Sequence, residues 1–117
     1  MSRAEKVQQA IKKEVSEIVR DELRDPRIGF VTITKVEVSQ DLKHAKIFAS
    51  ALGKKPKDDT FKALKSATPF IRRLLAQRMQ MRYTPEIAFK RDDSIEYSVY
   101  IAKKIDELHE NEQNKGN

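Results

Sequence analysis

Apolar side chains recur at intervals of three or four residues along the first stretch of the chain, between Val7 and Leu23. This spacing predicts an α-helix with one apolar face. Ser2 and Glu5 have the spacing of a capping box, so we expect the helix to begin there. Pro26 disfavours helical backbone in the residue before it, and the helix should therefore stop by residue 25.

Two predicted strands follow, one rich in β-branched residues and one in which apolar residues occupy every second position. Residues 30–39 carry Val, Ile and Thr, but their alternation slips near Thr34 and Lys35. Val31 and Ile33 have one parity, whereas Val36 and Val38 have the other. A β-bulge would keep both pairs on the core face, and the alternative is burial of the strand on both faces. Residues 45–51 alternate cleanly after a short turn, which predicts an antiparallel hairpin of two strands.

Helical periodicity returns between Phe61 and Leu75, across an interior proline. Pro69 has no amide proton and clashes with the preceding turn, so two helices joined at a kink fit this stretch better than one. Thr68 would cap the second helix, with Pro69 as its first residue. The amides of the next residues would then point outward at the positive end of a helix dipole, an arrangement that attracts phosphate.

The last part of the chain predicts one more strand and one more helix. Ile87 and Phe89 share one face of a short strand that opens around Pro85, a position where a proline is tolerated. Asp93 or Ser94 would cap the final helix. Its apolar stripe contains Ile95, Val99, Ala102, Ile105 and Leu108.

The element order αββααβα predicts a two-layer α+β domain, with helices packed on one face of a three-stranded sheet. We place this domain at residues 1–108. The segment 109–117 is too polar to pack and is expected to be a disordered tail.

The charge of the chain changes the functional picture. Its 117 residues are 36% charged, with 24 Lys and Arg against 18 Asp and Glu, and the net charge is +6. A basic surplus of this kind favours a polyanionic partner, most often nucleic acid. No apolar run approaches the roughly 20 residues that a bilayer span requires. Because there is also no leader-like segment and no cysteine, we expect a cytoplasmic protein with no membrane contact.

The residue types argue against an enzyme. His44 and His109 have no metal-ligand spacing, and the chain has neither a cysteine nucleophile nor a serine elbow. Paired acids such as Asp58 and Asp59 precede helices, where carboxylates act as caps and dipole partners. The three glycines form no phosphate-cradling motif. We therefore expect no catalytic residue, no metal, no cofactor and no small-molecule substrate.

The strongest charge asymmetry lies between Thr60 and Arg82, where six cations occur without a single acid. This stretch is the predicted polyanion surface. For Arg78 and Arg82, the alternative is that they only stabilise the C-terminus of their helix by interacting with the negative end of its dipole. For Arg24 and Arg27, which bracket a turn, the alternative is pairing with a neighbouring aspartate.

Three strings, at residues 24–48, 67–89 and 92–97, closely resemble the ribosome-binding factor A family. The resemblance implies a type II KH-like fold in which the first strand is central, antiparallel to the second and parallel to the third. It also implies a kink at Ala67-Thr68-Pro69, where the family has Ala-x-Gly and this chain has a proline in place of the glycine.

The resemblance further implies no catalytic activity and binding to the free 30S ribosomal subunit and its 16S rRNA. The implied role is late subunit maturation, including 16S rRNA 5′-end processing and adaptation to cold. We expect a monomer. The alternative is a basic protein-interaction module that docks an acidic partner without nucleic acid; DNA binding is less favoured because no groove-reading helix is apparent. The residues expected to bind RNA are Lys62, Lys65, Ala67, Thr68, Arg72, Arg73, Arg78, Arg82, Arg24 and Arg27.

Overall fold

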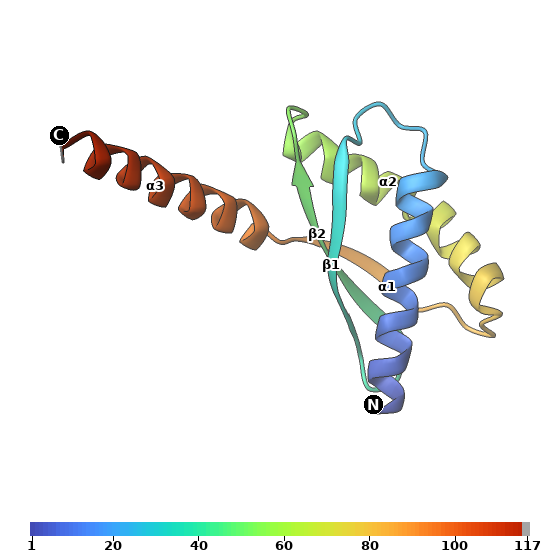
Figure 1. Cartoon of the computed structure of the whole chain (residues 1–117). Helices are drawn as coiled ribbons and strands as arrows, with labels where there is room; N and C mark the ends of the chain where they lie inside the picture. Colours follow the sequence, from blue (N-terminus) through green and yellow to red (C-terminus); the bar gives the residue numbers. More distant parts are fainter. Residues whose placement is uncertain (116–117) are drawn as a thin grey trace.

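The computed structural model describes the backbone of residues 1–115 and the side chains of residues 1–94 and 98–110. Its elements follow the order αββαβα, as Figure 1 shows. They are α1 (Arg3–Asp21), β1 (Phe30–Val38), β2 (His44–Leu52), α2 (Lys57–Met79), β3 (Glu86–Arg91) and α3 (Ser94–Lys115). The α+β class is therefore confirmed, with one helix fewer than the sequence predicts.

The sheet has three strands in the order β1-β2-β3. β2 pairs antiparallel with β1, which confirms the predicted hairpin, and parallel with β3. The expectation that the first strand is central is wrong, because β2 occupies that place. β2 has Ala45, Ile47, Ala49 and Ala51 all buried on its core face, as a strand paired on both sides is expected to have.

The predicted β-bulge in β1 is present. The pairing register between β1 and β2 shifts between Ile33 and Lys35. Ile33 and Val36 are both buried although their positions have opposite parity. The extra residue of the bulge is what turns both side chains toward the core.

α1 and α2 lie on the same side of the sheet and enclose the core (Figure 1). The hydroxyl oxygen of Ser2 accepts a hydrogen bond of 3.1 Å from the amide of Glu5, so the predicted N-cap of α1 is confirmed. The apolar stripe of α1 faces inward as expected. The fully buried centre of the core contains Ile11, Val15, Ile18, Ile47, Leu64, Ile71 and Leu75.

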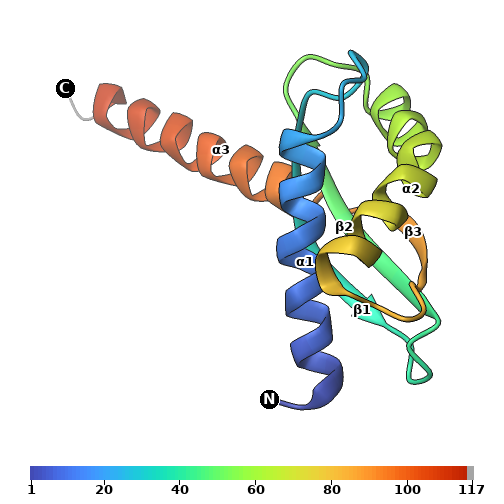
Figure 2. The same ribbon diagram turned by 90° about the vertical axis from the view of Figure 1, so that its right-hand side faces the viewer.

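α2 is one continuous helix of 23 residues with Pro69 in its interior, so the prediction of two separate helices is wrong. Thr68 does not cap a helix; its hydroxyl donates to the carbonyl of Leu64 at 3.0 Å. Leu64 and Ile71 are buried on either side of the proline, and this packing holds both turns in register despite the missing hydrogen bond. The helix is nevertheless bent, since its two halves run in different directions in Figure 2.

α3 does not pack on the helical face of the sheet as predicted, but projects away on the opposite side (Figure 1). Its direction is set by Asp92 at the end of β3, whose amide donates to the carbonyl of Ala49 at 2.9 Å. The carboxylate of Asp92 accepts two hydrogen bonds, one of 2.6 Å from the hydroxyl of Thr34 and one of 3.0 Å from the amide of Ser94. Hydrogen bonds from Ser94 and Thr34 lower the pKa of Asp92 to about 2. α3 then continues past the predicted domain boundary at residue 108 to Lys115.

Deletion of residues 109–117 should leave the fold intact. The described side chains of residues 98–110 are all exposed, so this part of α3 buries no side chain against the domain. Changes at such exposed positions alter stability by no more than about 0.5 kcal/mol. We therefore expect the Tm to fall by less than about 4 °C in a thermal melt followed by circular dichroism. A fall of ten degrees or more would show that the tail docks on the domain.

Candidate nucleic-acid interface

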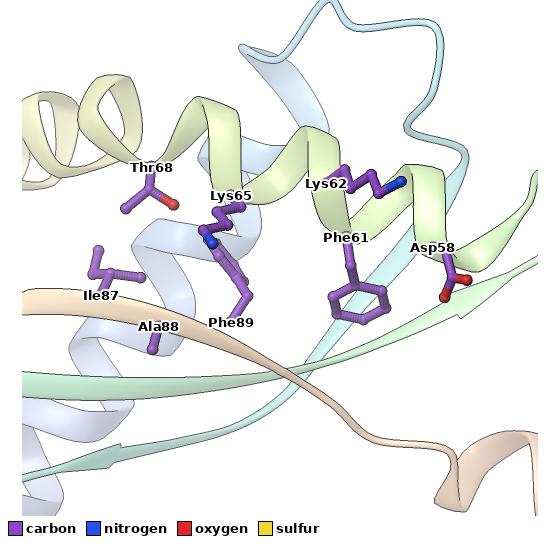
Figure 3. A pocket seen from close by; sticks show the side chains of 8 residues that line it. All are labelled: Asp58, Phe61, Lys62, Lys65, Thr68, Ile87, Ala88 and Phe89. Atoms are coloured by element: carbon purple, nitrogen blue, oxygen red, sulfur yellow. The ribbon is translucent and has the colours of Figure 1, made fainter.

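A groove runs between α2 and the edge strand β3 (Figure 3). It encloses a cavity of about 530 Å³. From α2 it is lined by Asp58, Phe61, Lys62, Lys65 and Thr68, and from β3 by Ile87, Ala88 and Phe89. In Figure 3, Phe61 and Lys65 point from the helix toward the strands, and Ile87 points up from β3 toward Thr68.

The floor of the groove is apolar. Phe61, Ile87 and Phe89 are half-buried and pack against the hydrophobic core, which keeps them in place. Ile87 and Phe89 share one face of β3, as the sequence predicts. Because β3 is an edge strand, no further strand closes the groove on that side.

The rim of the groove is cationic. The side chains of Lys62 and Lys65 are exposed and form no ion pair with any described residue. The one acid among the residues that line the groove, Asp58, lies 3.3 Å from the guanidinium of Arg91 and forms an ion pair with it. The groove thus combines an apolar floor with two unpaired ammonium groups, a combination suited to the sugar, base and phosphate of a nucleic-acid strand.

The phosphate site predicted at a helix start near Thr68 is absent. Because α2 continues through Pro69, the amides of residues 70–72 lie inside a helix and are not free donors. Phosphate attraction at this surface therefore depends on side chains. Thr68 still lines the groove, whereas Ala67 is half-buried against the core.

Arg72 has a structural role within the chain. Its half-buried guanidinium donates to the carbonyls of Pro85 and Thr84, each at 3.0 Å. These bonds tie the loop before β3 to the second half of α2. Pro85 beside them is fully buried. Arg72 thus positions the strand that forms one wall of the groove.

Arg78 and Arg27 are also paired within the chain. Arg78 lies between 3.4 and 3.5 Å from the carboxylates of Glu14, Glu17 and Glu22, and so links α2 to the first helix. Arg27 lies 2.7 Å from Asp25, which confirms the alternative of pairing with a neighbouring aspartate. Its hydrogen bonds lower the pKa of the Asp25 carboxyl to about 2.

The other predicted cations are open to solvent. Arg73 lies over the ring of Phe70 at 5.5 Å, and Arg82 lies over the ring of Tyr83 at 5.6 Å. Arg24 is exposed in the turn after α1. None of these three forms an ion pair with a described residue. Each is accessible to a ligand that extends beyond the groove.

The prediction from sequence missed the apolar lining of the groove. Phe61 on α2 and Ile87 and Phe89 on β3 have the spacing of core residues, and they do pack on the core while also facing the cavity. Ala88 carries no charge and no motif. Only the placement of β3 at the sheet edge, beside α2, shows that these residues form the floor of a groove.

The described part of the chain holds no cluster of three His, Cys, Asp or Glu side chains that is placed to bind a metal ion. None of its helices combines the length and the apolar character of a membrane span.

A family model described as "Ribosome-binding factor A" matches residues 3–105. The chain belongs to the ribosome-binding factor A family. The family member from Staphylococcus epidermidis is 47% identical over 112 residues, which cover 95% of this chain and 97% of that protein.

Solved structures of the family share the fold. The crystal structure of ribosome-binding factor A from Thermus thermophilus superposes with a TM-score of 0.70 at 24% identity, covering 75% of this chain and 93% of that one. A homology model of the same T. thermophilus factor, fitted into a cryo-EM map of a 30S–RbfA complex, has a TM-score of 0.65 at 24% identity. It covers 74% of this chain and 91% of that one. The likeness supports a KH-like α+β fold for this member of the family.

The structural role of Arg72 predicts a loss of stability when it is replaced. Arg72→Ala leaves the carbonyls of Thr84 and Pro85 without their charged donor, which should lower the free energy of unfolding by about 1–3 kcal/mol. The neighbouring Arg73→Ala is the matched control, and we expect it to change stability by less than about 0.5 kcal/mol. Urea denaturation measures both. Equal stability of the two variants would contradict the role assigned to Arg72.

Proposed function

We propose that this protein binds the free 30S ribosomal subunit in the cytoplasm and assists its late maturation, including processing of the 16S rRNA 5′ end, with a role in cold adaptation. It acts as a monomer and by binding, not by catalysis. The family assignment and the T. thermophilus factor fitted into a map of a 30S complex support this proposal.

The observation that carries the proposal is the groove between α2 and β3. Its unpaired Lys62 and Lys65 supply attraction for phosphate, which releases counterions and gives affinity independent of sequence. Its apolar floor offers a surface for a ribose or an unstacked base. A single strand of rRNA laid along the groove satisfies both features at once.

The finer fold assignment is type II KH-like, with the bend of α2 at the position of the family's Ala-x-Gly kink. In KH domains generally, a GxxG loop between two helices clamps the backbone of the RNA; the family has the Ala-x-Gly kink at this place instead. Here Pro69 offers no amide to a ligand, so the grip depends more on the two lysines than on backbone donors. Arg73, Arg82 and Arg24 extend the cationic surface beyond the groove.

Reversal of the two groove charges tests the proposal. Lys62→Glu with Lys65→Glu should lower affinity for purified 30S subunits at least tenfold, because two phosphate contacts are lost and two repulsions appear. The slope of log affinity against log salt should also become shallower by about 1.5 to 2. Both side chains are exposed, so the fold should persist in circular dichroism.

The matched control is Arg3→Glu with Lys6→Glu, which makes the same charge change on exposed positions of α1. We expect this variant to keep more than half of the wild-type affinity. Wild-type affinity of the groove variant together with loss of binding by the control would move the interface to α1 and overturn the proposal.

A further inference from the structure

The face of the sheet opposite α1 and α2 has a surface of its own, which we call the open face. α3 begins on this side but projects away from the sheet (Figure 1). Ile47 of the central strand β2 is buried in the core. Because successive side chains of a strand point to opposite faces, its neighbours Lys46 and Phe48 lie on the open face.

Phe48 is flanked by a lysine on each neighbouring strand. It pairs in register with Lys35 of β1 and with Lys90 of β3, and residues paired in this way point to the same face of a sheet. The ammonium group of Lys35 lies 5.9 Å from the centre of the Phe48 ring. Phe48 is half-buried, so part of its ring is accessible. The open face thus combines an aromatic ring with three lysines, since Lys46 lies two residues before Phe48.

Two of these lysines are available to an anionic ligand. Lys46 and Lys90 are exposed and form no ion pair with any described residue. Of the acids that β1 and β3 place on this face, Glu37 lies 2.8 Å from the ammonium group of Lys35. Glu86 lies four residues from Lys90, at the other end of β3. The surface around Phe48 is therefore positive, and it attracts a polyanion.

The open face is continuous with the groove between α2 and β3. A smaller cavity, of about 290 Å³, is lined in part by Lys46 and Lys90. Ile87 and Ala88 of the edge strand line both this cavity and the groove. Because β3 is an edge strand and Ala88 has a small side chain, a polymer that leaves the groove can cross β3 at this point.

We propose that the open face is a second binding surface for single-stranded RNA, on which an unpaired base stacks against Phe48 and the adjoining phosphates contact Lys46 and Lys90. This inference rests on the proposed function, because the bound strand is the continuation of the one that lies in the groove. An aromatic ring on an exposed sheet face is a stacking surface for unpaired bases, and cations beside it hold the backbone. The ring and the continuity with the groove favour RNA over an acidic protein segment.

Two variants test the two parts of this surface. Lys46→Gln with Lys90→Gln should lower affinity for purified 30S subunits at least about fivefold, and the slope of log affinity against log salt should become shallower by about 1.4, the value for two phosphates of a single strand. Phe48→Leu keeps an apolar side chain but removes the stacking, which should also lower affinity at least about fivefold. Arg3→Gln with Lys6→Gln is the matched control on α1 and should bind like the wild type. Wild-type affinity of either open-face variant would overturn the inference.

Crosslinking identifies what lies on the open face. A photoreactive lysine analogue is placed at position 46, and at position 65 for comparison, in the full chain bound to 30S subunits. We expect crosslinks to 16S rRNA from both positions. An rRNA crosslink from position 65 alone, or a crosslink from position 46 to a ribosomal protein or to a second copy of the chain, would overturn the inference and leave the proposed function standing. The absence of an rRNA crosslink from either position would refute the proposed function, and the inference with it.

Discussion

The parallel pairing of β2 with β3 is the constraint on which the rest of the structure depends. Parallel neighbours cannot be joined by a tight turn, so the chain must cross over the sheet between them, and α2 is that crossover. The crossover lays α2 beside the edge strand and opens the groove between the two. It also leaves the end of β3 free to direct α3 out of the opposite side of the sheet (Figure 1).

The groove depends on a small number of polar contacts at its ends. Arg72 holds the loop before β3, and the pair formed by Arg91 with Asp58 lies where β3 ends. Between these points the walls are set by side chains that are anchored in the core. The two lysines need no such anchoring, because a mobile ammonium group can follow the phosphates of a flexible strand.

Much of the fold could be predicted because its signals are local. The cap at Ser2, the bulge after Ile33 and the hairpin all follow from residue type and spacing. The continuity of α2 could not be predicted, because burial on both sides of Pro69 outweighs the local preference for a break. The central place of β2 and the projection of α3 depend on long-range contacts that periodicity does not encode.

The candidate site was predictable to the extent that it is one cationic segment of the sequence. Lys62 and Lys65 do line a groove, but Arg72 and Arg78 are used to hold the chain together. The sequence alone does not show which cations of the segment bind a ligand and which bind the chain itself. The groups that bind Arg78 are glutamates near the N-terminus of the chain, and those that bind Arg72 are carbonyls of the loop before β3, so both lie outside the cationic segment. The part of the apolar floor that β3 contributes has no sequence signal separate from that of an ordinary core strand.

Lysine footprinting tests the central claim, that RNA of the 30S subunit lies in the groove between α2 and β3. Acetylation of the protein, free and bound to purified 30S subunits, is read by mass spectrometry at each lysine. The groove predicts strong protection of Lys62 and Lys65 in the complex, with Lys6 on the first helix equally reactive in both states. Unchanged reactivity of Lys62 and Lys65 together with protection of Lys6 would contradict it.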